Sequence, residues 1–322
     1  MKNINYINVR LDRFIPFLLT ILLFSSCADF DRDFGEEELY TSSHAIAVSS
    51  SGGSTGLVAL DASILTYLME GESASSTPEF GLKAVDIAFD LRSNDMDMDG
   101  TTHFSTYHDY NNVLPNNYHT EFLWKFFYKV INQANGIINT IPDDSPEDIL
   151  VYKYKSHTYR AIAYFNLIRI FQFTTASDSA EAIPIDFGDF VGEENSTVGE
   201  VKKLILDDLT LAYNGLDGYV RSSKQEVDTN VVAAFLARYH LTYGNWAEAE
   251  SFSTEAMSYG SLSSDVSHGF DELSLSETIW GAAITAQTTT FYRSFFSHMS
   301  QISDGYSGWN HFKLINSNLY DQ

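Results

Sequence analysis

The sequence predicts a mainly α-helical protein built from tetratricopeptide-like helical hairpins with long loops between them. In residues 118–141 and 152–171, apolar side chains recur at spacings of three and four, which is the period of an α-helix. Residues 229–257 read as two shorter helices around a central glycine, with alanines where paired helices must approach closely. Strands do not alternate with helices along the chain, so an α/β fold is not expected.

Composition and charge restrict the class of protein. Of the 322 residues, 44% are hydrophobic, which is enough for a globular chain with a sizeable core. The 43 acidic residues against 19 basic ones give a net charge of −24, and such a field repels phosphate backbones. Nucleic-acid binding is therefore not expected, and neutral or cationic ligands are favoured. Aromatic residues, at 14%, mostly serve core packing, but exposed rings are also what sugar-binding proteins stack against pyranose faces.

Residues 1–26 are predicted to be a signal peptide. A basic start is followed by the apolar run 14–24, whose 11 residues are too few to span a membrane as a helix. Cys27 then follows two serines and is the only cysteine of the chain, a pattern that resembles a bacterial lipobox. We therefore expect Cys27 to be lipidated and residues 27–56 to form the lipidated N-terminus and a tether. An ordinary cleaved signal beside an incidental cysteine is the alternative.

The rest of the chain, 57–322, is predicted to form one helical domain. Pro142 and Pro146 separate the two longest helices, and Thr197 with Glu200 forms a capping box for the next one. The remaining helix starts are Asp228 or Thr229, and Asn245 with Glu248 after the turn at Gly244. The expected helices span residues 57–69, 118–141, 152–171, 198–216, 229–243 and 245–257, and residues 82–91 form a shorter apolar segment.

The helix over 152–171 is expected to be buried, because apolar residues cover nearly all of its circumference. Only Arg160 and Arg169 interrupt its second half with charge. A guanidinium in an apolar setting needs a carboxylate or several carbonyls, so both arginines are expected to be paired within the core.

Two of these helices resemble the SusD/RagB family, surface lipoproteins that bind nutrients, usually glycans, beside a TonB-dependent outer-membrane transporter. The signature helix of the family is matched by Arg160, Ala161, Ala163, Tyr164, Phe165, Leu167, Ile168, Arg169 and Phe171. A second family helix is matched by Trp124, Tyr128, Ile131, Ala134 and Asn135. The chain stops before an Asp-x-Arg motif that continues the family pattern, so the SusD-like domain is expected to be incomplete at its C-terminus.

The resemblance implies a lipid-anchored protein on the outer face of the outer membrane. It would bind an oligosaccharide or polysaccharide non-covalently and hand it to a SusC-like TonB-dependent transporter, without enzyme activity or a catalytic residue. The alternative, from the repeats alone, is a secreted tetratricopeptide-type scaffold that binds a protein and no glycan. A glycoside hydrolase is a third interpretation, since any pair of the many carboxylates can be read as catalytic.

Candidate ligand-binding residues come from two aromatic loops. In the polar loop 94–118, flat rings stand beside short amides, a combination that suits stacking on a sugar face and hydrogen bonds to its hydroxyls. A second aromatic loop covers 305–310. The candidates are Tyr107, Tyr110, Asn111, Asn112, Tyr306 and Trp309. For the first loop, the alternative is a polar segment whose tyrosines cap the core.

The loop 94–118 also contains a calcium-like pattern. Asp95, Asp97 and Asp99 precede Gly100, as at the start of an EF-hand loop. The twelfth position of such a loop, where a bidentate glutamate belongs, is Thr106. Because two of the expected oxygen ligands are missing, a solvated acidic turn is favoured and a calcium site is the weaker alternative. No other cofactor is expected.

Overall fold

A computed structural model describes residues 54–71, 79–99, 104–109, 114, 117–188, 194–265, 272–283, 285, 294–299 and 311–320. All of them belong to the compact unit of residues 42–322, which is described here by itself. The predicted signal peptide, Cys27 and most of the predicted tether lie outside these residues, so they stay predictions. The first described helix begins at Ser54 rather than at Leu57.

The described part of the chain is mainly helical, as predicted. The longer helices are α3 (Ser54–Glu70), α4 (Leu82–Asp90), α6 (Tyr118–Thr140), α7 (Glu147–Phe171), α8 (Val198–Gly215), α9 (Thr229–Thr242) and α10 (Trp246–Met257). The short elements are β1 (Met96–Met98), α5 (Ser105–His108), α11 (Phe295–Met299), β2 (Lys313–Ile315) and α12 (Ser317–Tyr320). Of the helices in these residues, none combines the length and the apolar character that crossing a membrane requires.

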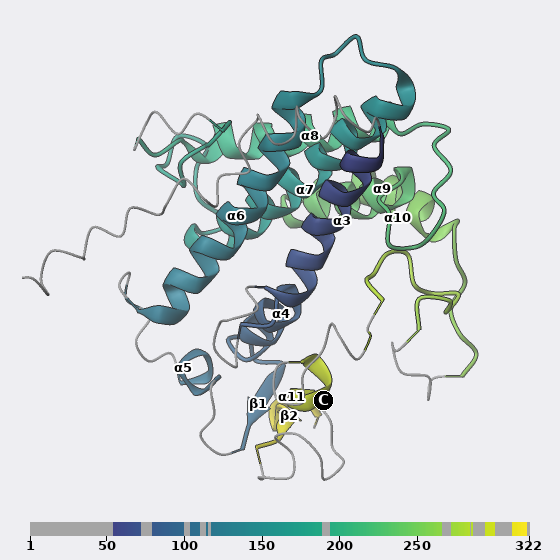
Figure 1. Cartoon of the computed structure of the whole chain (residues 1–322). Coiled ribbons are helices and arrows are strands. Elements are labelled where there is room, and N and C mark those ends of the chain that lie inside the picture. Colours follow the sequence, from purple (N-terminus) through teal and green to yellow (C-terminus); the bar gives the residue numbers. More distant parts are fainter. Residues whose placement is uncertain are drawn as a thin grey trace, which may run out of the picture. The chain divides into compact units, whose positions relative to one another are not determined.

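Helix α7 lies at the centre of the packing. It contacts α6 on one side and α8 on the other, and α3 packs across both α6 and α7 (Figure 1). Every residue from Lys155 to Ile168 is buried. A helix that is apolar on all sides exposes the least apolar surface to water when neighbours cover its whole circumference. The prediction of a buried helix over 152–171 is confirmed.

Successive helices pair into hairpins, as the repeat pattern predicts. Helix α8 contacts α9, and α9 packs closely against α10. On α10, Ala249 and Ala256 are buried against this interface, because their small side chains let the two helix backbones approach. The tetratricopeptide-like reading of this pair is confirmed.

The helix caps agree with the sequence in two cases and differ in one. Thr197 Oγ1 accepts a hydrogen bond from the Glu200 amide at 3.3 Å and the Glu200 side chain accepts from the Thr197 amide at 2.8 Å, which completes the capping box. Asp228 caps α9 through the Val231 amide at 3.1 Å. Asn245 is the N-cap residue of α10, as predicted, but its side chain makes no cap hydrogen bond, so the prediction is wrong in that respect. Its Nδ2 lies 3.2 Å from His240 Nδ1 on α9 instead.

The two arginines of α7 are held differently. Arg160 forms an ion pair with Asp208 of α8, at 2.8 Å, as expected for a buried guanidinium. Arg169 lies over the Phe165 ring, 5.0 Å from its centroid, and no carboxylate of the described residues pairs with it. The expectation of pairing was therefore correct for Arg160 and wrong for Arg169, whose half-buried position and aromatic neighbour replace the ion pair.

Gly81 precedes the first residue of α4 and lies against the last turns of α3, so its substitution tests the packing between these two segments. Its φ is +79°, and a Cβ built there would lie 2.4 Å from the Met69 carbonyl oxygen, a backbone atom. Gly81→Ala is therefore expected to destabilise the protein by about 2–3 kcal/mol, from backbone strain plus the steric clash. Gly218→Ala is the matched control: its φ is +77° with nothing within 4 Å, so only the strain remains. Urea denaturation measures both, and equal losses would contradict the packing of α3 on Gly81.

Candidate functional site

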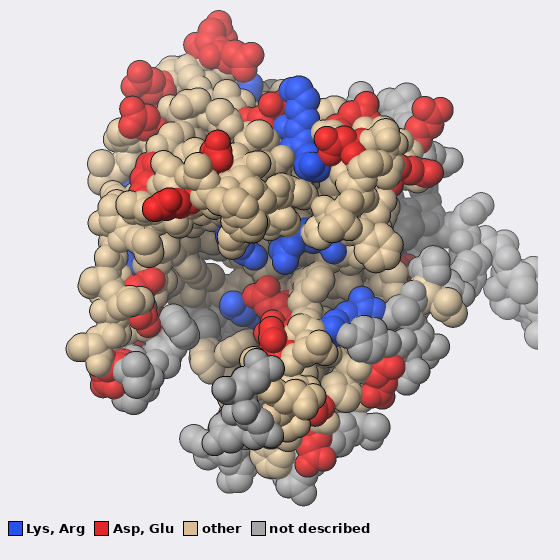
Figure 2. All heavy atoms as spheres, turned by 180° about the vertical axis from the view of Figure 1, so that it is seen from behind, with Lys and Arg blue, Asp and Glu red and all other residues tan. Residues whose placement is uncertain are grey.

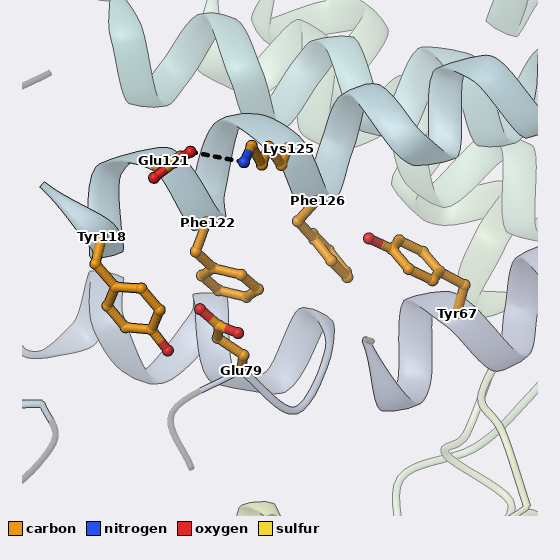
Figure 3. A pocket seen from close by; sticks show the side chains of 7 residues that line it. All are labelled: Tyr67, Glu79, Tyr118, Glu121, Phe122, Lys125 and Phe126. Atoms are coloured by element: carbon orange, nitrogen blue, oxygen red, sulfur yellow. Dashed lines mark ion pairs between the residues drawn. The ribbon is translucent and has the colours of Figure 1, made fainter. Parts of the chain in front are cut away.

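A pocket of about 190 Å³ lies between α3, the residues before α4 and the first half of α6 (Figure 3). Its walls are mostly aromatic, and its polar groups are two carboxylates, one ammonium group and two tyrosine hydroxyls. The lining residues are Tyr67, Glu79, Tyr118, Glu121, Phe122, Lys125 and Phe126. We call this hollow the aromatic pocket.

Helix α6 supplies most of the aromatic wall. Tyr118, Phe122 and Phe126 follow one another at intervals of four residues, which places them on one face of the helix. The Phe126 ring stacks on Tyr67 of α3, with 5.2 Å between centroids and 21° between planes, and Phe122 lies 5.6 Å from Phe126. Phe126 is buried and Tyr118 is 43% exposed, so the wall runs from the core to the solvent. The rings are held in place by each other before any ligand arrives.

The polar groups of the aromatic pocket come from separate segments. Glu79, three residues before the start of α4, is buried, and Figure 3 shows its carboxylate directed toward the rings of Tyr118 and Phe122. At the other side, Glu121 and Lys125 form an ion pair at 2.6 Å, with both side chains about half exposed. The arrangement offers ring faces for C–H groups and carboxylate oxygens that can accept hydrogen bonds from hydroxyls.

Of the six candidate ligand-binding residues, the structure describes Tyr107, and it is buried with 3% exposure. Its ring lies against His119, with 4.9 Å between centroids, and the Arg92 guanidinium is 5.7 Å above it. Burial raises the pKa of the Tyr107 hydroxyl above its ordinary value. A ring enclosed in this way fits the alternative of a core-capping tyrosine better than stacking on a ligand, and the binding role of Tyr107 stays a prediction.

The other candidates stay untested by the structure. Tyr110, Asn111, Asn112, Tyr306 and Trp309 lie outside the described residues. The aromatic pocket was not identified from the sequence, although Tyr118 stands at the end of the loop that was singled out. The spacing of Tyr118, Phe122 and Phe126 was the available signal. Tyr67 and Glu79 carry no such signal, because tertiary packing brings them to α6.

The acidic segment that resembles a calcium loop forms strand β1 instead of a turn. β1 pairs in antiparallel fashion with β2, with Met96 opposite Ile315. Asp97 Oδ1 accepts from the Met98 amide at 2.8 Å and lies 2.7 Å from His108 Nε2. The predicted turn is contradicted at residues 96–98, which a partner strand far along the chain holds extended, whereas Asp95 and Asp99 on either side are exposed to solvent as predicted. Within the described ranges, no three acidic or histidine side chains form a group that could hold a metal ion.

His108 links this strand to α5. Its Nδ1 lies 2.8 Å from Asp109 Oδ1, and its Nε2 faces Asp97. The hydrogen bond that His108 donates to Asp109 comes first among the causes that raise the pKa of His108, and the contact with Asp97 adds to it. The two carboxylates therefore favour the charged imidazolium, which fastens α5 to β1 beside the loop that carries the untested candidates.

A family model described as "SusD-like_3: Starch-binding associating with outer membrane" matches residues 69–241, more than half of the chain. No curated protein matches the sequence. Among solved structures, a SusD-like carbohydrate binding protein from Bacteroides vulgatus is similar, with a TM-score of 0.71 and 23% identity over 82% of this chain and 57% of that one.

Two further solved structures share the fold. A putative sugar binding protein from Bacteroides vulgatus has a TM-score of 0.67 and 16% identity, over 83% of this chain and 61% of that chain. A SusD superfamily protein from Bacteroides thetaiotaomicron has a TM-score of 0.62 and 18% identity, over 82% and 60%. The chain thus spans about 57–61% of the length of these three proteins.

Proposed function

The chain belongs to the SusD-like family, whose model is described as starch-binding and associating with the outer membrane, and we propose that it binds an oligosaccharide or polysaccharide non-covalently and hands it to a SusC-like TonB-dependent transporter. The family carries the first half of this proposal. The second half, the transporter, follows from the resemblance of the sequence. No catalytic step is part of the proposed function.

The aromatic stripe of α6 is the observation that supports a binding site for a sugar. The C–H face of a pyranose ring would stack on Tyr118 and Phe122. This contact would release water from the apolar surfaces of both the sugar and the protein. Sugar hydroxyls would donate hydrogen bonds to Glu79 and Glu121. The volume of about 190 Å³ is below the range of about 300–1,000 Å³ that holds drug-sized ligands, so the aromatic pocket suits one sugar unit of a longer chain.

The lipid anchor is a separate part of the proposal. It rests on Cys27 behind the apolar run 14–24, and acylation of this cysteine would make it the first residue of the mature chain. Several acyl chains, whose buried methylenes contribute about 0.8 kcal/mol each, hold a protein firmly at a membrane. Together with the family description, this supports a position on the outer face of the outer membrane. Fractionation of membranes from cells that express the full chain tests it.

Retardation in gels that contain a polysaccharide tests the proposed function. The full chain is expected to be retarded by at least one member of a broad neutral panel, and the Tyr118→Ala and Phe122→Ala variants are expected to bind about tenfold more weakly, because each loses about 1–1.5 kcal/mol of ring contact. Trp246→Ala is the control, since Trp246 is 68% exposed on α10, away from the aromatic pocket.

Two results would contradict this site. If folded wild-type protein, checked by circular dichroism, migrates unchanged in every polysaccharide, glycan binding is refuted. If the wild type is retarded and both pocket variants are retarded equally, the glycan binds elsewhere on the chain.

A protein-binding scaffold is the second candidate function, and one observation favours it. The α9–α10 hairpin exposes large apolar side chains at Leu241, Trp246 and Met257, which are 57%, 68% and 63% exposed. Capture of a protein partner that depends on Trp246, without retention by any polysaccharide, would support the scaffold in place of the glycan-binding function.

A further inference from the structure

A second, larger cavity of about 690 Å³ lies among α3, α4, α7, α9 and the segment 272–283. This volume falls within the range of about 300–1,000 Å³ found for ligand pockets. Its floor is aliphatic, from α3, α4 and α7. Its functional groups come mainly from the other side, where Phe235, Arg238, Thr278 and Trp280 line it. None of its residues belongs to the aromatic pocket.

Trp280 forms a fixed wall of this larger cavity. Its Nε1 donates a hydrogen bond to the Gln225 carbonyl oxygen at 3.0 Å, and its ring meets Phe235 edge-on, with centroids 6.1 Å apart. The side chain remains partly exposed. The same four residues, Phe235, Arg238, Thr278 and Trp280, also line a neighbouring hollow of about 330 Å³. Because Trp280 lies between two hollows, a ligand ring stacked on it can extend into either of them.

Two guanidinium groups lie around one aromatic ring at this place. Arg238 is 6.0 Å from the centroid of Phe165 and 5.6 Å from that of Phe235, and Arg169 is 5.0 Å from Phe165. Burial lowers the pKa of Arg169, and repulsion from Arg238 lowers it further. Across the described residues, no carboxylate forms an ion pair with either arginine. A guanidinium that stacks by its faces keeps its in-plane N–H donors for a carboxylate.

The charged side chains that line the cavity are two cations, Lys83 and Arg238, and two anions, Asp86 and Glu272. Lys83 and Asp86 line it and pair with each other at 3.1 Å, so they largely cancel. Glu272 balances Arg238 in number among the lining residues. Arg169 does not line the cavity but is a further cation close to Arg238. Figure 2 shows Lys and Arg side chains gathered around a central hollow on one face, with a few acidic groups beside them. The chain as a whole carries a charge of −24.

We propose that this cavity is a second saccharide site, which takes a sugar unit with one carboxylate, such as a uronic acid. The carboxylate would bind the in-plane N–H groups of Arg238, and the sugar ring would lie against Trp280. Asn166, Ser274 and Thr278 line the cavity and offer partners for hydroxyls. The net charge, with Asp86 and Glu272 nearby, disfavours a polyanion, so one acidic unit in an otherwise neutral glycan is the ligand class. The inference rests on the proposed saccharide binding, but not on the aromatic pocket.

A matched pair of ligands tests the role of the carboxylate. A disaccharide of glucuronic acid and glucose and its methyl ester have the same rings and differ by one charge. In calorimetric titrations of the full chain, the acid is expected to bind at least about tenfold more tightly than the ester, since hydrogen bonds to charged groups contribute about 1.5–3 kcal/mol. Arg238→Gln is expected to abolish this preference. Lys203→Gln, at an exposed lysine on α8 that lines no part of the cavity, is expected to retain it.

The outcomes separate this inference from the proposed function. Equal binding of acid and ester, failure of both to bind, or a preference that survives Arg238→Gln would each overturn the acidic-sugar site. Ala282→Trp, which fills the cavity, is expected to abolish binding of the acid while retardation by neutral polysaccharides persists. Phe122→Ala is expected to weaken retardation by neutral polysaccharides while binding of the acid persists. Persistence of acid binding in a folded Ala282→Trp variant would also overturn the inference.

Discussion

Replacement of Lys155 by methionine is expected to lower the free energy of unfolding by about 3–5 kcal/mol, because it leaves buried carboxylates without their cation. Lys155 on α7 is 1% exposed. Its Nζ lies 2.9 Å from Oε2 of the partly buried Glu226 and 3.6 Å from Oδ2 of the buried Asp61, and it donates to the Tyr219 hydroxyl at 3.0 Å. The methionine fills a similar volume, so the loss measures the missing charge rather than a cavity.

Urea denaturation at neutral pH measures the effect of Lys155→Met. Lys203→Met is the matched control, because Lys203 pairs with Asp207 one turn along α8 with both side chains mostly exposed. An exposed pair of this kind contributes only about 0.3–0.5 kcal/mol. Similar small losses for the two variants would show that water, and not Lys155, compensates the carboxylates of Asp61 and Glu226.

The second large effect is expected for Asp208→Asn, also at about 3–5 kcal/mol. Both oxygens of Asp208 receive bonds from Arg160, at 2.8 Å each, and Oδ1 lies 2.6 Å from His157 Nδ1. Arg160 also donates to Asn135 Oδ1 at 2.8 Å. Asp208 and Arg160 are 3% and 5% exposed, so the amide would leave a buried guanidinium uncompensated. The network joins α6, α7 and α8, and all three helices should lose stability together.

The same substitution has a defined dependence on pH. Burial raises the pKa of Asp208, but the hydrogen bonds from Arg160 and His157 outweigh it, and the folded-state pKa lies below the ordinary value of 3.8. A carboxylate with a lowered folded pKa contributes stability that is complete above its unfolded pKa, about 3.9, and lost as the pH falls through the folded value. The stability difference between wild type and Asp208→Asn is therefore expected to be constant near neutral pH and to shrink below about pH 4.

Urea midpoints measured from neutral pH to acid test this dependence. Asp207→Asn, at the exposed neighbour of Asp208 on α8, is expected to change stability little at any pH. A difference between wild type and Asp208→Asn that stays the same down to the acid end would contradict the assignment of the lowered pKa to Asp208.

The sequence by itself determined the helices, because their signals are local. The period of apolar residues over 118–141 and 152–171 predicts α6 and α7, and the caps at Thr197 and Asp228 act within three residues of themselves. The family was also readable, since its motifs lie on these same helices. That Arg160 needs a carboxylate followed from burial alone, although the identity of Asp208 as the partner did not.

Tertiary structure decided which of these side chains line a site. Residues 96–98 became a strand because residues 313–315 pair with them, and no pattern near Asp97 indicates that partner. Tyr107 was enclosed by packing on His119, whereas Tyr67 and Glu79 were brought to the face of α6 that carries Phe122. Burial and pairing are sums over contacts between distant segments, so the periodicity of one segment predicts its helix but not which side chains of that helix meet a ligand.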